Sequence, residues 1–253
     1  MDNMVLQPPD VETASEGYAS RFQGSAGQYL LRAQERALLS LLPHCSPLTV
    51  LDVGGGHGQT ASVLAREGHA VTVLGSTPEA FHRLRALGLQ HRCRLATGDL
   101  LSTPFADASF DVVVSVRLIS HMEDWQRLIA EMCRVARGAV IIDYPRTVGV
   151  NALTPVLFGV KQRFEGNTRT YRSFSDEQIA DVFDGSGYRV VARVGQFVLP
   201  MVVHRFTGAG PVSRGLESLA ARLGLRDRFG SPVMIRADRR TAGQRSASAG
   251  EQI

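Results

Sequence analysis

Nine consecutive residues near position 50 have the types and spacing of a ligand-binding turn. From Val50 to Gly58 they read V-L-D-V-G-G-G-H-G, so an apolar run ends in Asp52 and three glycines follow. Glycines after a buried strand permit positive φ and let a ligand approach backbone that has no Cβ. The N–H groups that open the next helix suit a polar or anionic group. Asp52 favours a ligand with a cationic amine, because its carboxylate would repel the pyrophosphate of a dinucleotide.

This segment resembles the strand-one motif of the class I S-adenosylmethionine-dependent methyltransferases, which is roughly V-L-D-x-G-x-G-x-G. The resemblance implies S-adenosylmethionine as the cofactor and a Rossmann-like, mostly parallel sheet whose seventh strand is antiparallel and lies beside the fifth. Within the class, the chain looks most like the small-molecule methyltransferases related to ubiquinone and menaquinone biosynthesis. A generic nucleotide-binding glycine loop is the alternative interpretation of the same residues.

Strands and helices must alternate around this turn to position it. We expect strands at Thr49–Val53, Ala70–Leu74, Arg94–Ala96, Phe110–Val116 and Ala139–Asp143, and helices at Tyr29–Leu42, Gln59–Arg66, Thr77–Leu87 and Asp124–Val135. Strands separated by helices predict an α/β protein with a doubly wound parallel sheet. The β-branched run after Phe110 lacks polar alternation, which indicates a strand that is covered on both faces.

The alternation breaks after Asp143, where the first of two long irregular stretches begins. Between and after these stretches we expect a helix that starts at Ser175 with a capping box to Gln178, a strand at Tyr188–Val194, a helix at Arg214–Leu223 and a last strand at Pro232–Ala237. We predict a flexible leader over residues 1–17, a methyltransferase domain over 18–237 and a disordered tail over 238–253. Substrate-covering insertions are expected near 144–174 and 195–213.

Composition narrows the class of protein. The chain has 253 residues, 44% of them hydrophobic, and no apolar run long enough to cross a membrane. Its net charge of +4 owes much to arginines near the C-terminal end, and no basic stripe is interleaved with aromatic residues, so nucleic-acid binding is not expected. The three cysteines have neither metal-ligand nor disulfide spacing, and the N-terminal segment is unlike a signal peptide. These features predict a cytoplasmic protein without a metal site, and they leave its oligomeric state open.

The resemblance assigns cofactor contacts to the ends of successive strands. Asp99 would accept from the adenine amino group, because a carboxylate is an acceptor only, and the N–H of Leu100 would face the ring. Tyr18 in the leader would fold over the site as part of a lid, although aromatic residues at such spacings also simply pack. The cofactor-binding residues predicted in this way are Asp52, Gly54, Gly56, Gly75, Ser76, Asp99, Leu100, Val116 and Tyr18.

Gly75 departs from the family pattern. At this position the family usually has an Asp or Glu that accepts hydrogen bonds from both ribose hydroxyls. The sequence offers Ser76, Thr77, Glu79 or a water molecule as substitutes. Loss of such a charge-assisted hydrogen bond costs about 1.5–3 kcal/mol, enough to weaken cofactor binding roughly tenfold or more.

The residues that would meet the methyl acceptor are less sharply marked. His121 could remove a proton from a phenol or hydroxyl, although it could equally cap or pack the following helix. Tyr144 follows strand five, the other place where such contacts occur. The apolar run Phe197–Val203, with arginines nearby, would suit a greasy acceptor with an anionic group, but it could also pack under the domain or touch a membrane surface.

We therefore predict methyl transfer from S-adenosylmethionine to a small-molecule acceptor, apolar or lipid-like, with oxygen favoured over nitrogen or carbon. His121 and Tyr144 are the candidate catalytic residues. One alternative is a noncatalytic binding protein with a methyltransferase fold, for which Gly75 is the main support. A less favoured alternative is an NAD-dependent oxidoreductase, which Asp52 and the glycine spacing oppose.

Overall fold

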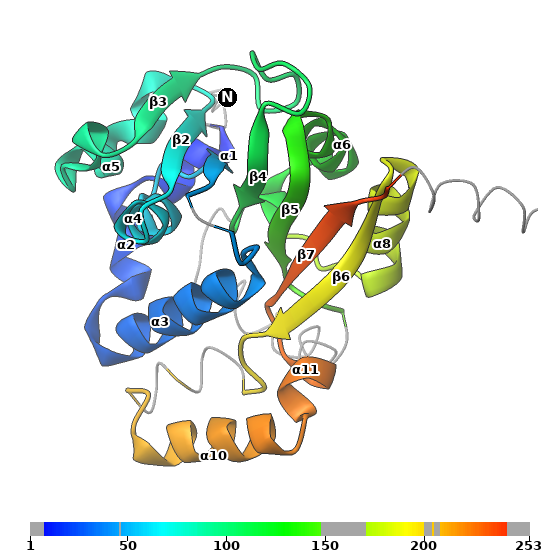
Figure 1. Cartoon of the computed structure of the whole chain (residues 1–253). Coiled ribbons are helices and arrows are strands. Elements are labelled where there is room, and N and C mark those ends of the chain that lie inside the picture. The colour runs from blue at the N-terminus through cyan, green and yellow to red at the C-terminus, as the bar shows by residue number, and fades with distance from the viewer. Residues whose placement is uncertain (1–7, 46, 148–170, 200–203, 205–207, 242–253) are drawn as a thin grey trace, which may run out of the picture.

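One seven-stranded sheet organises the protein, which is described by a computed structural model covering residues 8–45, 47–147, 171–199, 204 and 208–241 (Figure 1). The strand order is β3-β2-β1-β4-β5-β7-β6, and β7 runs antiparallel to both of its neighbours. This arrangement confirms the predicted doubly wound sheet with its last strand inserted beside the fifth. The strands are β1 Thr49–Val53, β2 Ala70–Gly75, β3 Arg94–Thr97, β4 Phe110–Ser115, β5 Ala136–Tyr144, β6 Tyr188–Gly195 and β7 Val233–Arg239.

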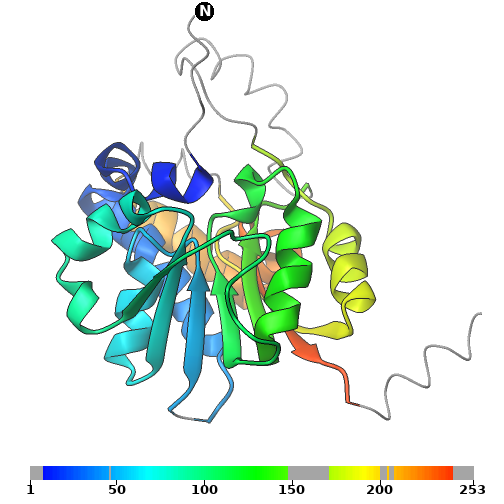
Figure 2. The ribbon, with the colours of Figure 1, turned by 90° about the horizontal axis from the view of Figure 1, so that it is seen from above.

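Helices form a layer on each face of the sheet (Figures 1 and 2). Helices α3, α4 and α5 contribute to the hydrophobic core on one face, and α6 and α8 contribute to the core on the other. The longer helices are α3 Gly24–Leu41, α4 Gln59–Arg66, α6 Trp125–Val135, α8 Asp176–Gly185 and α10 Pro211–Arg222. The shorter ones are α1 Pro9–Thr13, α2 Glu16–Ala19, η1 Ser20–Phe22, η2 Pro78–Phe81, α5 His82–Ala86, η3 Leu89–His91, η4 Ile119–His121 and α11 Leu225–Phe229.

The central strands are buried on both faces, as the apolar runs predict. Successive residues of β1 point to opposite faces, so Val50 packs with the α3 and α4 layer while Leu51 packs with the α6 and α8 layer. Both side chains are fully buried. Since β1 pairs in parallel with β2 and β4, the carboxyl ends of these strands meet at one edge of the sheet. The chain crosses over at this point, where open α/β sheets bind ligands.

Local signals in the sequence hold at several element boundaries. Helix α8 begins after Ser175, whose side chain accepts from Gln178 N while the Gln178 side chain accepts from Ser175 N, so the predicted capping box is confirmed. The single helix expected over Thr77–Leu87 is instead the 3-10 turn η2 followed by the short helix α5. A tightened first turn lets Phe81 bury its ring in the core.

The leader differs from the flexible segment predicted over residues 1–17. Its described part folds into α1 and α2, with Asp10 completely buried and Arg83 paired to Glu16 at 3.1 Å. Contacts with η2, rather than any helical periodicity of its own, order this segment. Large parts of the predicted insertions, residues 148–170, 200–203 and 205–207, and residues 242–253 of the predicted tail lie outside the described residues.

Candidate functional site

The turn after β1 requires glycine at several positions. Gly54 and Gly58 have φ values of 71° and 78°, in the left-handed region that favours glycine. A Cβ on Gly56 would lie 1.9 Å from the carbonyl oxygen of Ala80, and one on Gly55 would lie 2.0 Å from the Asp52 carboxylate. The glycines therefore allow positive φ angles in the turn, and they also leave room for neighbouring atoms of the protein itself.

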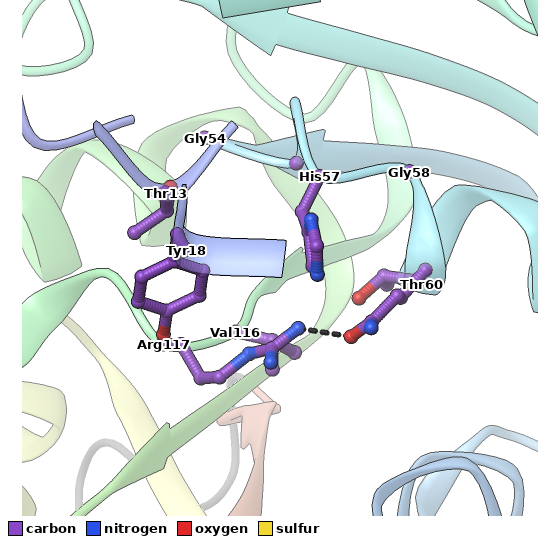
Figure 3. Close-up of a pocket in the computed structure, with 10 residues that line it drawn as sticks. Thr13, Tyr18, Gly54, His57, Gly58, Thr60, Val116 and Arg117 are labelled. Carbon is purple, nitrogen blue, oxygen red and sulfur yellow. Dashed lines mark hydrogen bonds between the residues drawn. The ribbon is translucent and has the colours of Figure 1, made fainter. Parts of the chain in front are cut away.

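A small cavity of about 10 Å³ lies beside this turn (Figure 3). It brings together residues of the leader, the glycine turn, the start of α4 and the end of β4. Of the predicted cofactor residues, Tyr18, Gly54 and Val116 line it directly. The same cavity is also lined by residues that were not predicted from the sequence, namely Thr13, His57, Gln59, Thr60 and Arg117.

Asp52 is a buried carboxylate without a partner. Its side chain is fully buried, and neither of its oxygen atoms has a hydrogen-bond partner among the described residues. Burial raises the pKa of Asp52 to about 7, although the positive charge of Arg117 opposes the rise. A buried acceptor left unpaired costs about 1–3 kcal/mol, so a cationic ligand near Asp52 would relieve a real penalty.

Arg117 places a cation next to that carboxylate. Its φ is 61°, and its backbone N–H donates to Asp143 Oδ1 at 2.5 Å. The guanidinium lies over the ring of Phe22, 4.4 Å from its centroid, and 5.7 Å from the centroid of Tyr18. It also donates to the side-chain oxygen of Gln59, the hydrogen bond drawn in Figure 3, while Nη1 is buried without a partner. The rings of Tyr18 and Phe22 thus form a surface that holds a positive charge.

His57 completes the aromatic cluster. Its ring centroid lies 5.8 Å from those of both Tyr18 and Phe22, and both of its ring nitrogens are buried without partners. Burial lowers the pKa of His57 to about 3, and the charge of Arg117 lowers it further. The imidazole is therefore neutral at physiological pH.

The end of β2 has no room for an acidic side chain at the predicted ribose position. A Cβ on Gly75 would lie 2.9 Å from Ala80 Cβ and 2.9 Å from Phe81 Cζ. The next residue, Ser76, instead donates from its N–H and its hydroxyl to the carboxylate of Asp10. Asp10 is a contact that the sequence analysis missed, and the local sequence has no signal for it.

The predicted adenine contacts lie at the end of β3. Asp99 is exposed, and its Oδ1 accepts from the N–H of Leu101 at 2.8 Å. Leu100 is buried and belongs to the core on the α6 and α8 face. Neither residue lines the cavity, so their role toward a cofactor stays a prediction.

The two candidate catalytic residues lie in different surroundings. His121 ends η4, partly exposed, with its ring 5.7 Å from that of Tyr171. Tyr144 is buried against Phe174, and its hydroxyl donates to Asp176 at 2.8 Å. The structure therefore does not bring Tyr144 to the cavity, because alternation along β5 turns Tyr144 to the α6 and α8 face and Asp143 to the other.

Asp143 is the residue of β5 that faces this region. Burial raises its pKa to about 6, although the N–H and the charge of Arg117 oppose the rise. Two carboxylates, Asp52 and Asp143, thus approach the single guanidinium of Arg117. Both carboxyl groups have raised pKa values because both are fully buried.

The described part of the predicted acceptor run packs rather than forming a pocket. Phe197 is buried with Leu30 and Ala33 of α3. His204 is buried and lies 3.2 Å from Glu217 Oε1. These contacts favour the packing interpretation for the described residues, while residues 200–203 and Arg205 lie outside them.

No described helix combines the length and the apolar character needed to cross a bilayer. The described residues also contain no group of three or more histidine, cysteine or acidic side chains that could hold a metal ion.

Comparison with known proteins shows what part of the chain is similar to. Residues 51–142 match the family described as "Methyltransferase domain". The chain is 35% identical over 107 residues to norajmaline N-methyltransferase of Rauvolfia serpentina, a match that covers 40% of this chain and 36% of that protein. The chain thus spans only about a third of the length of this curated relative.

Solved structures show the same fold over almost the whole chain. A structure from Thermotoga maritima, described as a SAM-dependent methyltransferase and possible histamine N-methyltransferase, has a TM-score of 0.65 at 16% identity and covers 91% of this chain and 98% of that one. Magnesium protoporphyrin IX methyltransferase from Synechocystis PCC 6803, with bound SAH, has a TM-score of 0.62 at 13% identity over 90% and 97% of the two chains. Over residues 51–142 the chain thus matches a methyltransferase domain, and over almost its whole length it has the fold of these methyltransferase structures.

Proposed function

We propose that the chain binds S-adenosylmethionine beside the glycine turn and transfers its methyl group to a small-molecule acceptor. The observation that carries this proposal is Asp52, a fully buried carboxylate without a partner next to the turn that the family match begins with. The negative charge of an ionised Asp52 suits a cofactor that carries positive charges. In this role Asp52 pairs with the amino group of the methionine part, with Gly54, Gly56 and Val116 against the same part of the ligand.

The aromatic side chains of the leader supply the second feature that fits. Tyr18 and Phe22 already hold the guanidinium of Arg117 over their rings. Rings that stabilise one cation can stabilise a sulfonium in the same way. Asp99 and Leu100 serve the adenine, and Gly75 and Ser76 lie against the ribose, as the family pattern implies.

Cofactor entry requires side chains to move. The cavity has about 10 Å³, whereas sites for drug-sized ligands usually have roughly 300–1,000 Å³. Arg117 is the side chain best able to clear this space, because its guanidinium is held by one side-chain hydrogen bond and by ring contacts. Its departure would expose Asp52 to the incoming amine.

The cofactor brings an electrophilic methyl group, so the protein's contribution is positioning and the exclusion of water. Tyr18 and His57 line the cavity, Phe22 packs against both of them, and in this proposal the three rings exclude water from the cofactor. His121 is the group that takes a proton from an acceptor hydroxyl, with Tyr171 beside it. Tyr144 holds Asp176 rather than an acceptor, so its part in the reaction is to position the end of β5.

The acceptor remains an apolar or lipid-like small molecule in this proposal, with oxygen as the methylated atom. Nitrogen is the second candidate, because the Rauvolfia serpentina relative is named as an N-methyltransferase. Membership of the ubiquinone and menaquinone group, a cytoplasmic location and contact with a membrane surface are kept as predictions.

A noncatalytic binding protein is the second candidate function. The observation that favours it is the small size of the same cavity, which the chain's own Arg117 lines. Titration calorimetry of the full chain with S-adenosylhomocysteine separates the two candidates. We expect saturable binding with one ligand per chain and none for NAD. No heat at millimolar ligand would overturn the enzymatic proposal.

A positive titration should be followed by an activity test. The full chain is incubated with isotopically labelled S-adenosylmethionine and a panel of apolar phenols, carboxylic acids and amines. Label transfer to phenols that His121→Gln reduces more than tenfold at saturating acceptor supports oxygen methylation with His121 as base. Transfer to amines alone would correct the methylated atom to nitrogen.

A further inference from the structure

The end of β2 excludes the acidic side chain that the cofactor's ribose would need. A Cβ on Gly75 would lie 2.9 Å from both Ala80 Cβ and Phe81 Cζ, and those two residues are buried in the core. A carboxylate at position 75 would therefore displace Phe81. A carboxylate that serves the ribose here therefore has to come from a residue other than position 75.

The leader places a carboxylate at the very next residue. Ser76 N–H donates to Asp10 Oδ2 at 2.6 Å, and the Ser76 hydroxyl donates to Asp10 Oδ1 at 2.7 Å. These residues are 66 positions apart in the chain. Asp10 has an exposed fraction of 0%. A buried carboxylate with two short hydrogen bonds is held in one orientation.

Helix α1 connects this point with the glycine turn. Asp10, Thr13 and Ala14 are three and four residues apart, so they share one face of the helix. Thr13 lines the cavity beside the turn, and Ala14 Cβ lies 3.2 Å from where a Cβ on Gly56 would be. The face that carries Asp10 is therefore the face turned toward the proposed cofactor site.

We infer that Asp10 is the ribose-binding carboxylate of this protein, supplied by the leader in place of the missing acid of β2. The inference rests on the proposed function. Each carboxylate oxygen offers two lone-pair directions, and Ser76 uses one on each oxygen. The remaining pair suits a group with two neighbouring hydroxyls, which is what a ribose presents.

The test compares two ligands on the same variant of the full chain. Calorimetry measures the affinity of wild type and Asp10→Asn for S-adenosylhomocysteine and for its 2′,3′-dideoxy analogue. We expect Asp10→Asn to weaken binding of the first ligand about 10- to 100-fold, because hydrogen bonds to a charged group are lost. The affinity for the dideoxy analogue should change less than about threefold, because this ligand has no ribose hydroxyls that could donate to Asp10.

The quantity compared is the affinity for S-adenosylhomocysteine divided by the affinity for the dideoxy analogue. This ratio does not depend on a general loss of structure in the leader. General loosening of α1 would weaken both ligands equally, and an equal loss would overturn the inference and leave Asp10 a structural residue. Glu12→Gln, an exposed carboxylate on the same helix, is the matched control and should leave the ratio unchanged. Ser76→Ala removes one of the two donors that orient Asp10 and should lower the ratio by a smaller factor.

The two proposals fail in different ways. Wild-type protein that binds no S-adenosylhomocysteine overturns the proposed function itself. Wild-type protein that binds it tightly, with an Asp10→Asn variant that binds it equally well, overturns only the assignment of Asp10.

Discussion

Two clusters of buried charge lie at the carboxyl edge of the sheet, and they differ in how their polar atoms are satisfied. Beside the glycine turn, five side-chain atoms of Asp52, His57 and Arg117 are buried without partners among the described residues. At the end of β5, Asp176 accepts from Tyr144 at 2.8 Å, from Arg146 Nε at 3.0 Å and from Arg193 at 2.6 Å.

This difference indicates that the cluster beside the glycine turn can bind a ligand, whereas the cluster around Asp176 stabilises the fold. A buried polar atom without a partner destabilises the protein, so several beside one cavity indicate groups that a ligand could pair. A carboxylate surrounded by donors has nothing left to offer a ligand. Tyr144 belongs to the second kind of cluster, although its position at the carboxyl end of β5 suggested the first.

The largest expected effect is on stability, and it concerns the cluster that Asp176 forms with Tyr144, Arg146 and Arg193. Asp176→Ala should lower the free energy of unfolding by about 3–5 kcal/mol, because it removes the carboxylate from a buried ion pair. The Arg146 side chain, which pairs with Asp176, has an exposed fraction of 8%. Chemical denaturation measures the loss, and the affinity of the folded fraction for S-adenosylhomocysteine should not change.

Asp184→Ala is the matched control for that experiment. It breaks the ion pair with Arg240 in which the Asp184 side chain is half exposed, so it should cost less than about 1 kcal/mol. An Asp176→Ala variant as stable as this control would remove the distinction between the two clusters.

The next effect concerns Asp52. Asp52→Asn should weaken binding of S-adenosylhomocysteine about 10- to 100-fold, as expected when a charged hydrogen bond is lost. Without ligand at pH 8, the same change should not reduce the free energy of unfolding, because it removes an unpaired buried charge. Calorimetry measures the affinity and denaturation measures the stability on one preparation. An Asp52→Asn variant that loses stability but keeps its affinity would show that Asp52 stabilises the fold and does not bind the ligand.

A pH series sharpens the same point. The pKa of Asp52 is raised to about 7, above its value of about 4 in an unfolded chain, so the folded protein holds a proton that the unfolded chain releases between these values. The contribution of Asp52 to stability is thus present below about pH 4 and is lost as the pH rises through 7. The free energy of unfolding of wild type, relative to Asp52→Asn, should fall over this range.

Ligand binding should have the opposite dependence. A cationic amine binds the ionised form of Asp52, so affinity for S-adenosylhomocysteine should rise up to about tenfold between pH 6 and pH 8. His57 stays neutral over this range, because its pKa lies near 3. Titrations in buffers of different ionisation enthalpy should detect proton release near pH 6, and a flat profile that matches Asp52→Asn would contradict the assignment.

The smallest effect concerns Arg117. Its guanidinium must leave the rings of Tyr18 and Phe22 before the cofactor enters, and such contacts are worth roughly 0.5–2 kcal/mol. Arg117→Ala should therefore tighten binding of S-adenosylhomocysteine by about two- to tenfold. Arg21→Ala removes an exposed cation over the same Tyr18 ring but outside the cavity lining, and it should leave affinity unchanged. Weaker binding by Arg117→Ala would show that Arg117 contacts the ligand instead.

Much of the sheet could be predicted from the sequence because its signals are local. The apolar run before Gly54 ends where β1 ends, and the capping box at Ser175 starts α8 as expected. The single helix predicted after Thr77 is divided into a 3-10 turn and a short α-helix, and Phe81 at the junction is buried in the core. The face of Tyr144 was not predictable, since β5 is buried on both sides and its alternation carries no polar signal.

The amino-acid sequence by itself determined the glycine turn, the acid before it and the order of strands and helices that places both at the edge of a parallel sheet. Those features depend on residues close together in the chain. Only the tertiary structure decided that Asp10 binds Ser76 and that Arg117 occupies the space over Tyr18 and Phe22. Such contacts join residues that are far apart in the chain. They form because packing of the leader against the strands buries charged groups, and a buried charge is unfavourable unless another group of the protein or a ligand pairs with it.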